Sequence, residues 1–274
     1  MNFITQVTIS IVLYFIMRIS VKRSSSLYIS SLVASLSYIL MYLFLYQSIT
    51  LLPTIHFLVT GLSLIILFIS YYEIVLLERN VRKIKLGLFQ NAGGSMVQQL
   101  AYALAHANEY LNLFDGNSII SVVFKVSIGS NYFFEIGKIR ALRLLWTTLS
   151  ETYNMNKHCT ITTTPSRRNK TIYDYNVNML RTTTECMSSV LGGANIICNQ
   201  PYNELFQEST EFGERISRNQ LLILKKESYF DAVNNPSDGS YYIENLTIQL
   251  STKALGVFKN IEANGGFLKQ LKKG

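Results

Sequence analysis

The chain has 274 residues, of which 49% are hydrophobic and only 15% charged, and its formal net charge is +8 at pH 7. This charged fraction is below the usual range of soluble domains, which indicates that part of the chain is membrane-like. Basic residues cluster at only two short stretches, 79–85 and 269–273, and a nucleic-acid footprint would be broader, so no nucleic-acid partner is predicted. The three cysteines lack the spacing of metal ligands or of a disulfide framework, which predicts free thiols in a reducing compartment.

Long apolar runs dominate the first part of the chain, at 3–17, 27–47 and 51–77. The second and third reach the roughly 20 residues that a helix needs to cross about 30 Å of hydrocarbon. Basic residues follow the first and third runs, and their bias toward the cytoplasm places the amino terminus outside and everything after the third run inside. We therefore predict a membrane segment with two or three transmembrane helices over residues 1–85, which enters the membrane through residues 1–77. A cytoplasmic domain over residues 86–274 is expected to follow.

In the cytoplasmic part, apolar side chains alternate between two periods. Apolar residues recur at helical spacing over residues 95–113, whereas residues 119–128 alternate with the period of two that is typical of a strand. The pattern continues with a helix around 133–145, a strand over 158–164, a helix over 173–191 and a short strand over 194–199. Such alternation implies parallel strands joined by right-handed crossovers. The sequence thus predicts an α/β domain, either a barrel or a doubly wound sheet.

One predicted strand favours a barrel with an unusual interior. Thr160, Thr162 and Thr164 lie on one face of it, whereas bulky branched side chains fill the interior of an ordinary barrel. Small hydroxyl side chains would leave room along the axis, although a sheet with one solvated face explains the same pattern. The sequence holds no glycine-rich phosphate loop and no His, Asp or Glu set with triad or metal-ligand spacing.

Five runs of the cytoplasmic part resemble methylmalonyl-CoA mutase, in the order in which that family carries them. They are QNAGGSMVQQLAYALAHANEYLN (90–112), IGSNYFFEIGKIRALRLLW (128–146), TPSRRNKTIYDYNVNMLRTTTECMSSVLGGA (164–194), EFGERISRNQLLILKKESYF (211–230) and DGSYYIENLTIQL (238–250). The resemblance runs from about residue 87 to 273 and does not include residues 1–85. It implies the carboxyl-terminal half of a (β/α)8 TIM-type barrel, a partial barrel preceded here by an all-α transmembrane segment. In this family the barrel surrounds coenzyme A, and adenosylcobalamin supplies the radical.

Within the family, the chain is similar to the small, non-catalytic subunit. Leu88 matches the histidine of the GYHMQEAG run of catalytic chains, and Ser121 matches their arginine for the coenzyme A phosphate. Thr162 and Thr164 match the histidine and glutamine of HSQTSGW, and Cys198 matches the histidine of LHTN. An isobutyl group can donate neither a proton nor a hydrogen bond. Catalytic, substrate-binding and metal-binding residues are therefore not expected in this chain.

The resemblance also implies a cofactor and a partner. The sequence has no DxHxxG run, which carries the lower cobalt ligand in the family, so adenosylcobalamin is expected in the complex but not on this chain. The chain is expected to form a heterodimer with a catalytic subunit that interconverts methylmalonyl-CoA and succinyl-CoA. A half barrel exposes two strand edges, which predicts aggregation or a partner chain that closes it.

Three other interpretations remain open at this point. The first is a membrane protein whose function lies in residues 1–77, with a vestigial mutase fragment. The second is a mutase-like chain that is itself an enzyme. The third is a chimeric reading frame that joins two unrelated sequences at about residues 80–87, as opposed to a genuine membrane-tethered fusion.

Overall fold

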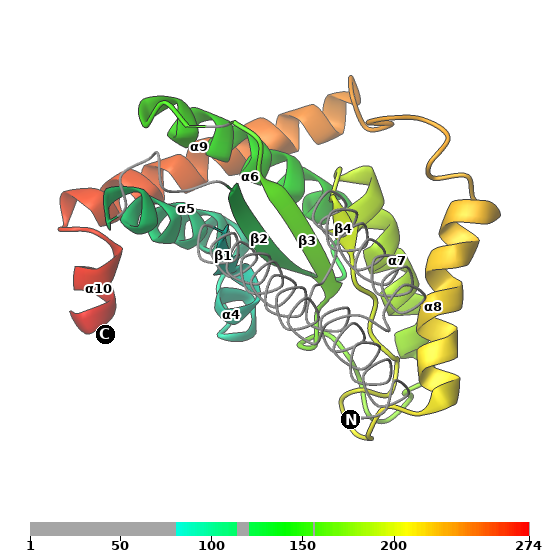
Figure 1. The fold of residues 1–274 in the computed structure, drawn as a ribbon. Helices are drawn as coiled ribbons and strands as arrows, with labels where there is room; N and C mark the ends of the chain where they lie inside the picture. Colours follow the sequence, from blue (N-terminus) through cyan, green and yellow to red (C-terminus); the bar gives the residue numbers. More distant parts are fainter. Residues whose placement is uncertain (1–80, 114–120, 156, 274) are drawn as a thin grey trace, which may run out of the picture. The chain divides into compact units, whose positions relative to one another are not determined.

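A computed structural model describes residues 81–113, 121–155 and 157–273 of the chain (Figure 1). The predicted transmembrane helices lie outside these residues. Across the described ranges, no helix is both long enough and apolar enough to span a membrane. The chain divides into two compact units, Met1–Arg79 and Asn80–Gly274, and the structural description below concerns the second.

The described strands form one parallel sheet whose order follows the sequence, β1-β2-β3-β4 (Figure 1). Each strand pairs with the next strand along the chain, and every pair is parallel. This order is that of a (β/α)8 barrel, whereas a doubly wound sheet has a point at which the strand order reverses. The predicted α/β alternation is confirmed, and the sheet is consistent with part of a TIM-type domain. The strands are β1 (Val81–Lys85), β2 (Ser121–Ile128), β3 (Thr160–Pro165) and β4 (Ile196–Ile197).

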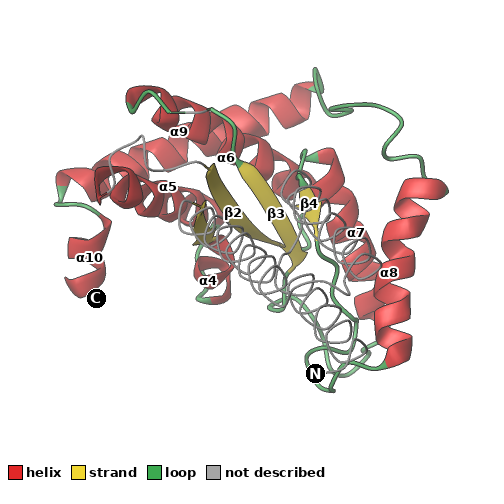
Figure 2. Cartoon of the chain, in the orientation of Figure 1, coloured by secondary structure: helices red, strands yellow, loops and turns green. Residues whose placement is uncertain are grey.

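Helices provide the crossovers that parallel strands require (Figure 2). The long helix α9 packs along both α5 and α6, and the short α10 folds back on α5. Helix α8 begins at Thr210, whose hydroxyl accepts a hydrogen bond from the Gly213 amide at 3.1 Å, a typical N-cap. The helices are α4 (Leu86–Asn91), α5 (Met96–Leu113), α6 (Tyr132–Thr152), α7 (Val177–Leu191), α8 (Glu211–Lys226), α9 (Tyr241–Ala263) and α10 (Phe267–Lys273).

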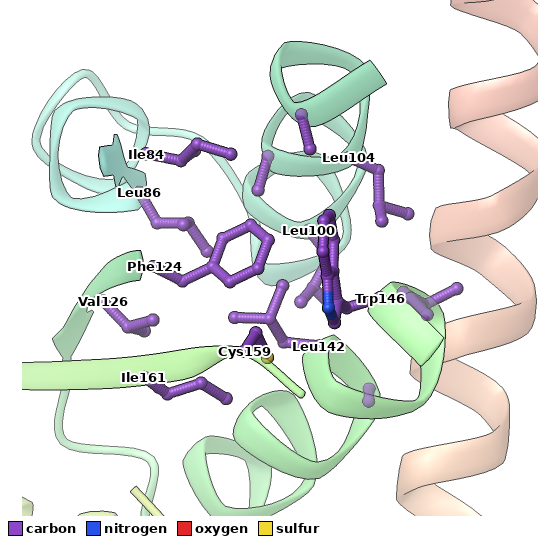
Figure 3. Packing of buried hydrophobic residues seen from close by; sticks show 14 of the residues in the cluster. Ile84, Leu86, Leu100, Leu104, Phe124, Val126, Leu142, Trp146, Cys159 and Ile161 are labelled. Carbon is purple, nitrogen blue, oxygen red and sulfur yellow. The ribbon is translucent and has the colours of Figure 1, made fainter. Parts of the chain in front are cut away.

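A hydrophobic core fills the space between one face of the sheet and helices α5, α6 and α9 (Figure 3). The alternating residues of β2 that the sequence assigned to one face are at most 2% exposed and belong to this core. Phe124 meets Trp146 of α6 edge to face, with ring centroids 5.6 Å apart. Burying a side chain of this size contributes about 1.5–3 kcal/mol. Because the core covers this face, only the opposite face of the sheet is available for a functional site. The β2 core residues are Val122, Phe124, Val126 and Ile128.

Candidate functional site: the polar face and carboxyl edge of the sheet

The face of the sheet opposite the core carries mostly polar side chains. Strand register places Lys85 beside Lys125, and Lys125 beside Thr162. Further along the same strands, Ser127 lies beside Thr164. Because side chains alternate between the two faces of a strand, these residues point away from the core. The threonines of β3 thus share one face, as predicted, and Lys125 lies on the polar face of β2, as its alternation also predicted, whereas Lys85 belongs to a strand that the sequence reading did not predict.

The five positions predicted to be substituted do not all come together. Leu88 lies on α4 and is 64% exposed, and α4 lies near the carboxyl end of β2 because Gly87 approaches the Ser127 hydroxyl. Thr164 ends the same polar row on β3, and the Cys198 amide, just after β4, donates to the carbonyl of Thr163 at 2.9 Å. These residues belong to the carboxyl half of the sheet.

Ser121 lies apart from the other predicted positions. It is the first residue of β2, six residues before Ser127. At about 3.3 Å per residue, the two ends of this stretch are roughly 20 Å apart. A single small ligand at the carboxyl edge would therefore not contact Ser121.

A hollow of about 340 Å³ opens at the carboxyl edge, the edge at which (β/α)8 barrels bind their ligands. Its walls come from the loops that follow α4, β2 and β3. Gln90 and Ser166 meet here: the Gln90 amide donates to the Ser166 hydroxyl at 2.8 Å, although 76 residues separate them in sequence. The Ser166 amide also donates to the Ile128 carbonyl at 2.7 Å. These bonds join α4 to the ends of β2 and β3.

A buried ion pair lies next to the carboxyl end of β2. Lys138 Nζ lies 2.5 Å from Glu135 Oε2, and the side chains are 0% and 2% exposed. The lysine also donates to the Ser127 carbonyl at 2.8 Å, and the other oxygen of Glu135 accepts from the Gly129 amide at 2.9 Å. Such extra hydrogen bonds are what a buried pair needs to offset the loss of hydration. The pair thus fixes the loop between β2 and α6.

A second buried pair holds the loop after β3. Lys170 Nζ lies 2.6 Å from Glu185 Oε2, and Asn169 Nδ2 donates to the other oxygen at 2.5 Å. Burial raises the pKa of Glu185, and the nearby Lys170 charge acts in the opposite direction. Burial likewise lowers the pKa of Lys170, again opposed by its partner. Both carboxylates at this edge are therefore engaged in holding loops, which favours a structural role over acid-base chemistry.

Neither histidine of the described part lines the hollow at the carboxyl edge. The ring of His106 on α5 stacks on Phe267 of α10, with centroids 5.3 Å apart. Burial lowers the pKa of His106, and Glu109 partly offsets this. His158 precedes β3 and so lies toward the amino edge of the sheet.

Sequence reasoning missed both the Gln90–Ser166 contact and the lysines of strand β1. A signal for the lysines was present, because Lys83 and Lys85 alternate with buried Ile84 in the pattern of a strand. Gln90 and Ser166 are polar residues beside loops, and nothing local indicates that they meet.

The consecutive parallel strands, the crossover helices and the polar face form an α/β domain that is consistent with part of a barrel of the (β/α)8 class. The chain belongs to the methylmalonyl-CoA mutase family, whose match, described as "Methylmalonyl-CoA mutase", covers residues 60–274. The family match begins before the resemblance predicted from residue 87, within the third apolar run. The predicted family is confirmed.

Individual relatives include both small subunits and other mutase chains. The methylmalonyl-CoA mutase small subunit of Porphyromonas gingivalis is 42% identical over 65% of this chain and 30% of that protein. The methylmalonyl-CoA mutase of Rhizobium meliloti is 37% identical over 68% of this chain and 27% of that protein. The small subunit of Propionibacterium freudenreichii is 32% identical over 66% of this chain and 30% of that protein. The chain thus spans less than a third of the length of these relatives.

Proposed function

We propose that this chain is a small, non-catalytic subunit that supports the adenosylcobalamin-dependent interconversion of methylmalonyl-CoA and succinyl-CoA by a catalytic mutase chain. The observation that carries the proposal is the side-chain chemistry at the substituted positions. Leu88 presents a hydrocarbon at the carboxyl edge. Thr162 and Thr164 present hydroxyls where catalytic chains have an imidazole and an amide. Neither leucine nor threonine titrates near neutral pH, so neither can act there as a general acid or base.

The lysines of the polar face support the same proposal. Lys85 and Lys125 are neighbours on the face that lines the axis of a closed barrel. The interior of an eight-stranded barrel is only just wide enough for side chains to fill. Two long side chains at this level would obstruct the path of a substrate such as coenzyme A.

The residues that the structure describes do not fit a cobalamin site. In the family, a histidine is the lower cobalt ligand, and the described residues contain two histidines, His106 and His158. His106 stacks on Phe267 of α10, and His158 lies toward the amino edge of the sheet. We therefore assign the cofactor and its radical chemistry to the partner chain.

The partner that we propose is a large, catalytic mutase subunit. Among the relatives, Propionibacterium freudenreichii has both a small and a large methylmalonyl-CoA mutase subunit, each 32% identical to this chain. This chain resembles both subunits. At the five positions, however, it lacks the histidines, the arginine and the glutamine of catalytic chains, which fits the small-subunit role.

Co-expression tests this proposal. The tagged full chain is produced with and without the large mutase subunit encoded in the same genome, and turnover of methylmalonyl-CoA is measured with added adenosylcobalamin. We expect the two chains to co-purify, and turnover to require the large subunit. Turnover by this chain alone would overturn the non-catalytic role. A large subunit that is fully active alone and does not co-purify would overturn the subunit role.

We also propose that residues 1–77 attach the chain to a membrane, with the mutase-like part in the cytoplasm. The support for this attachment is the sequence alone, because two of its apolar runs are long enough to cross a bilayer. Alkaline carbonate extraction of membranes that carry the full chain provides the test. We expect the chain to stay with the membrane pellet, and its release into the supernatant would contradict the attachment.

A further inference from the structure

Three lysines, Lys83, Lys85 and Lys125, gather on the polar face of strands β1 and β2, and we refer to them as the lysine face. All three are exposed. Lys85 and Lys125 are partners in register on neighbouring strands, which lie about 4.8 Å apart. Lys83 is two residues before Lys85, about 7 Å along the same strand. Three ammonium groups can therefore converge on one small area.

The described residues do not neutralise this charge. Lys138, Lys157 and Lys170 each form an ion pair with a glutamate, but no ion pair of the described ranges includes a lysine of the lysine face. Like charges at opposite positions of adjacent strands are destabilising. A group of negative charges over this face would relieve the repulsion.

A second copy of the chain is a poor candidate to cover the face. Two four-stranded sheets could in principle close an eight-stranded barrel through their free edges. That closure would place twice the three lysines in one narrow interior with no carboxylate from either polar face. Burying unpaired ammonium groups costs several kcal/mol for each ion. The charge on the face therefore argues against self-closure.

The chain's own first 80 residues are also a poor source of negative charge. They contain only two acidic residues, Glu73 and Glu78, and a larger number of basic ones. These 80 residues therefore offer little charge that could neutralise the lysine face.

We propose that the lysine face is a docking surface for an acidic, extended segment of a partner protein, whose carboxylates pair with Lys83, Lys85 and Lys125. A protein segment is favoured over a small anion because β1 is the terminal strand of the described sheet. The backbone groups at a sheet edge can pair with an added strand, while alternate side chains of that strand meet the face. This inference goes beyond the mutase proposal and does not depend on it.

The test uses a synthetic acidic strand as the probe. A fluorescein-labelled peptide of about eight residues, in which glutamate alternates with threonine, has the length of an ordinary strand. Its binding to the full chain in mild detergent is measured by fluorescence anisotropy at low ionic strength. The control peptide has glutamine in place of every glutamate. We expect the glutamate peptide alone to bind, and added salt to weaken the complex.

Matched lysine variants locate the contact. The double variant Lys85→Gln, Lys125→Gln should bind the peptide about tenfold more weakly, because two ion pairs are lost. The double variant Lys253→Gln, Lys259→Gln removes the same charge from the exposed surface of α9 and should bind as the original chain does. Unchanged Trp146 fluorescence shows that each variant is folded.

Several outcomes would overturn the proposal. It fails if both double variants lose the same affinity, since the binding would then reflect net charge alone. Absence of binding by the glutamate peptide to the folded original chain would also exclude it. Displacement of the peptide by equimolar inorganic pyrophosphate would assign the face to a small anion instead of a protein segment.

Discussion

Replacing Lys138 by methionine should strongly destabilise the unit that contains it, Asn80–Gly274. The substitution keeps most of the side-chain volume but removes the ammonium group, which is 0% exposed and lies 2.5 Å from Glu135. Glu135 would keep one backbone hydrogen bond, from Gly129, and would otherwise remain a buried carboxylate without its countercharge. Removing one partner of such a pair costs about 3–5 kcal/mol.

The exposed pair between Lys157 and Glu151 provides a matched control. Its side chains are 61% and 51% exposed, and its lysine lies 2.7 Å from the carboxylate. Since solvent screens such a pair, Lys157→Met should cost at most about 1 kcal/mol. The double variant Lys138→Met, Glu135→Leu should regain most of the lost stability, because an apolar pair can replace a buried ion pair at little cost.

Unfolding by urea measures these differences in the full chain in mild detergent. The single tryptophan, Trp146, is 1% exposed and packs against Phe124, so its fluorescence reports the core directly. If Lys138→Met costs no more than Lys157→Met, the buried pair is not what holds this edge of the sheet.

Two further predictions use a glycine and the cysteines. Gly192→Ala should cost about 1–3 kcal/mol in the same urea assay, because its new methyl group would lie 2.9 Å from Ile139. At Gly256 in α9 a new methyl group would meet no atom within 4 Å, so Gly256→Ala should instead stabilise the fold by about 0.5–1 kcal/mol. If both variants change the free energy of unfolding equally, the close packing of Gly192 against Ile139 is wrong. Burial raises the pKa of the Cys186 thiol to about 12, whereas Cys198 is exposed. At about pH 8, iodoacetamide should therefore modify Cys198 in the folded chain and Cys186 only after unfolding, as mass spectrometry can show.

The alternation of helices and strands could be predicted because it depends on local periodicity. The pattern of β2 correctly separated the buried face from the polar one, and the predicted helices over 95–113 and 173–191 overlap α5 and α7. Strand β1 was missed because four basic residues lie within 79–85, so the segment reads as the charged end of an apolar run. The burial of Ile84 within this charged segment depends on contacts with distant residues.

The candidate site was predictable only in part. The positions of Thr162 and Thr164 on one face follow from the period of two, and the separation of Ser121 from the carboxyl edge follows from its place at the start of β2. The contact between Gln90 and Ser166 joins residues that are 76 positions apart. The paired lysines Lys85 and Lys125 depend on strand register. Register is a property of the assembled sheet, and neither strand encodes it alone.

The two faces of the sheet separate the residues that pack the core from those that can vary. Ile161 is 0% exposed in the core, while its neighbour Thr162 points to the opposite face. Because successive residues of a strand face opposite sides, a change at Thr162 leaves the packing of Ile161 intact. Residues on the core face must stay apolar to keep the sheet stable, whereas residues on the polar face can change without loss of this packing. Side chains on the polar face, such as that of Thr162, can therefore change without disturbing the packing of the core.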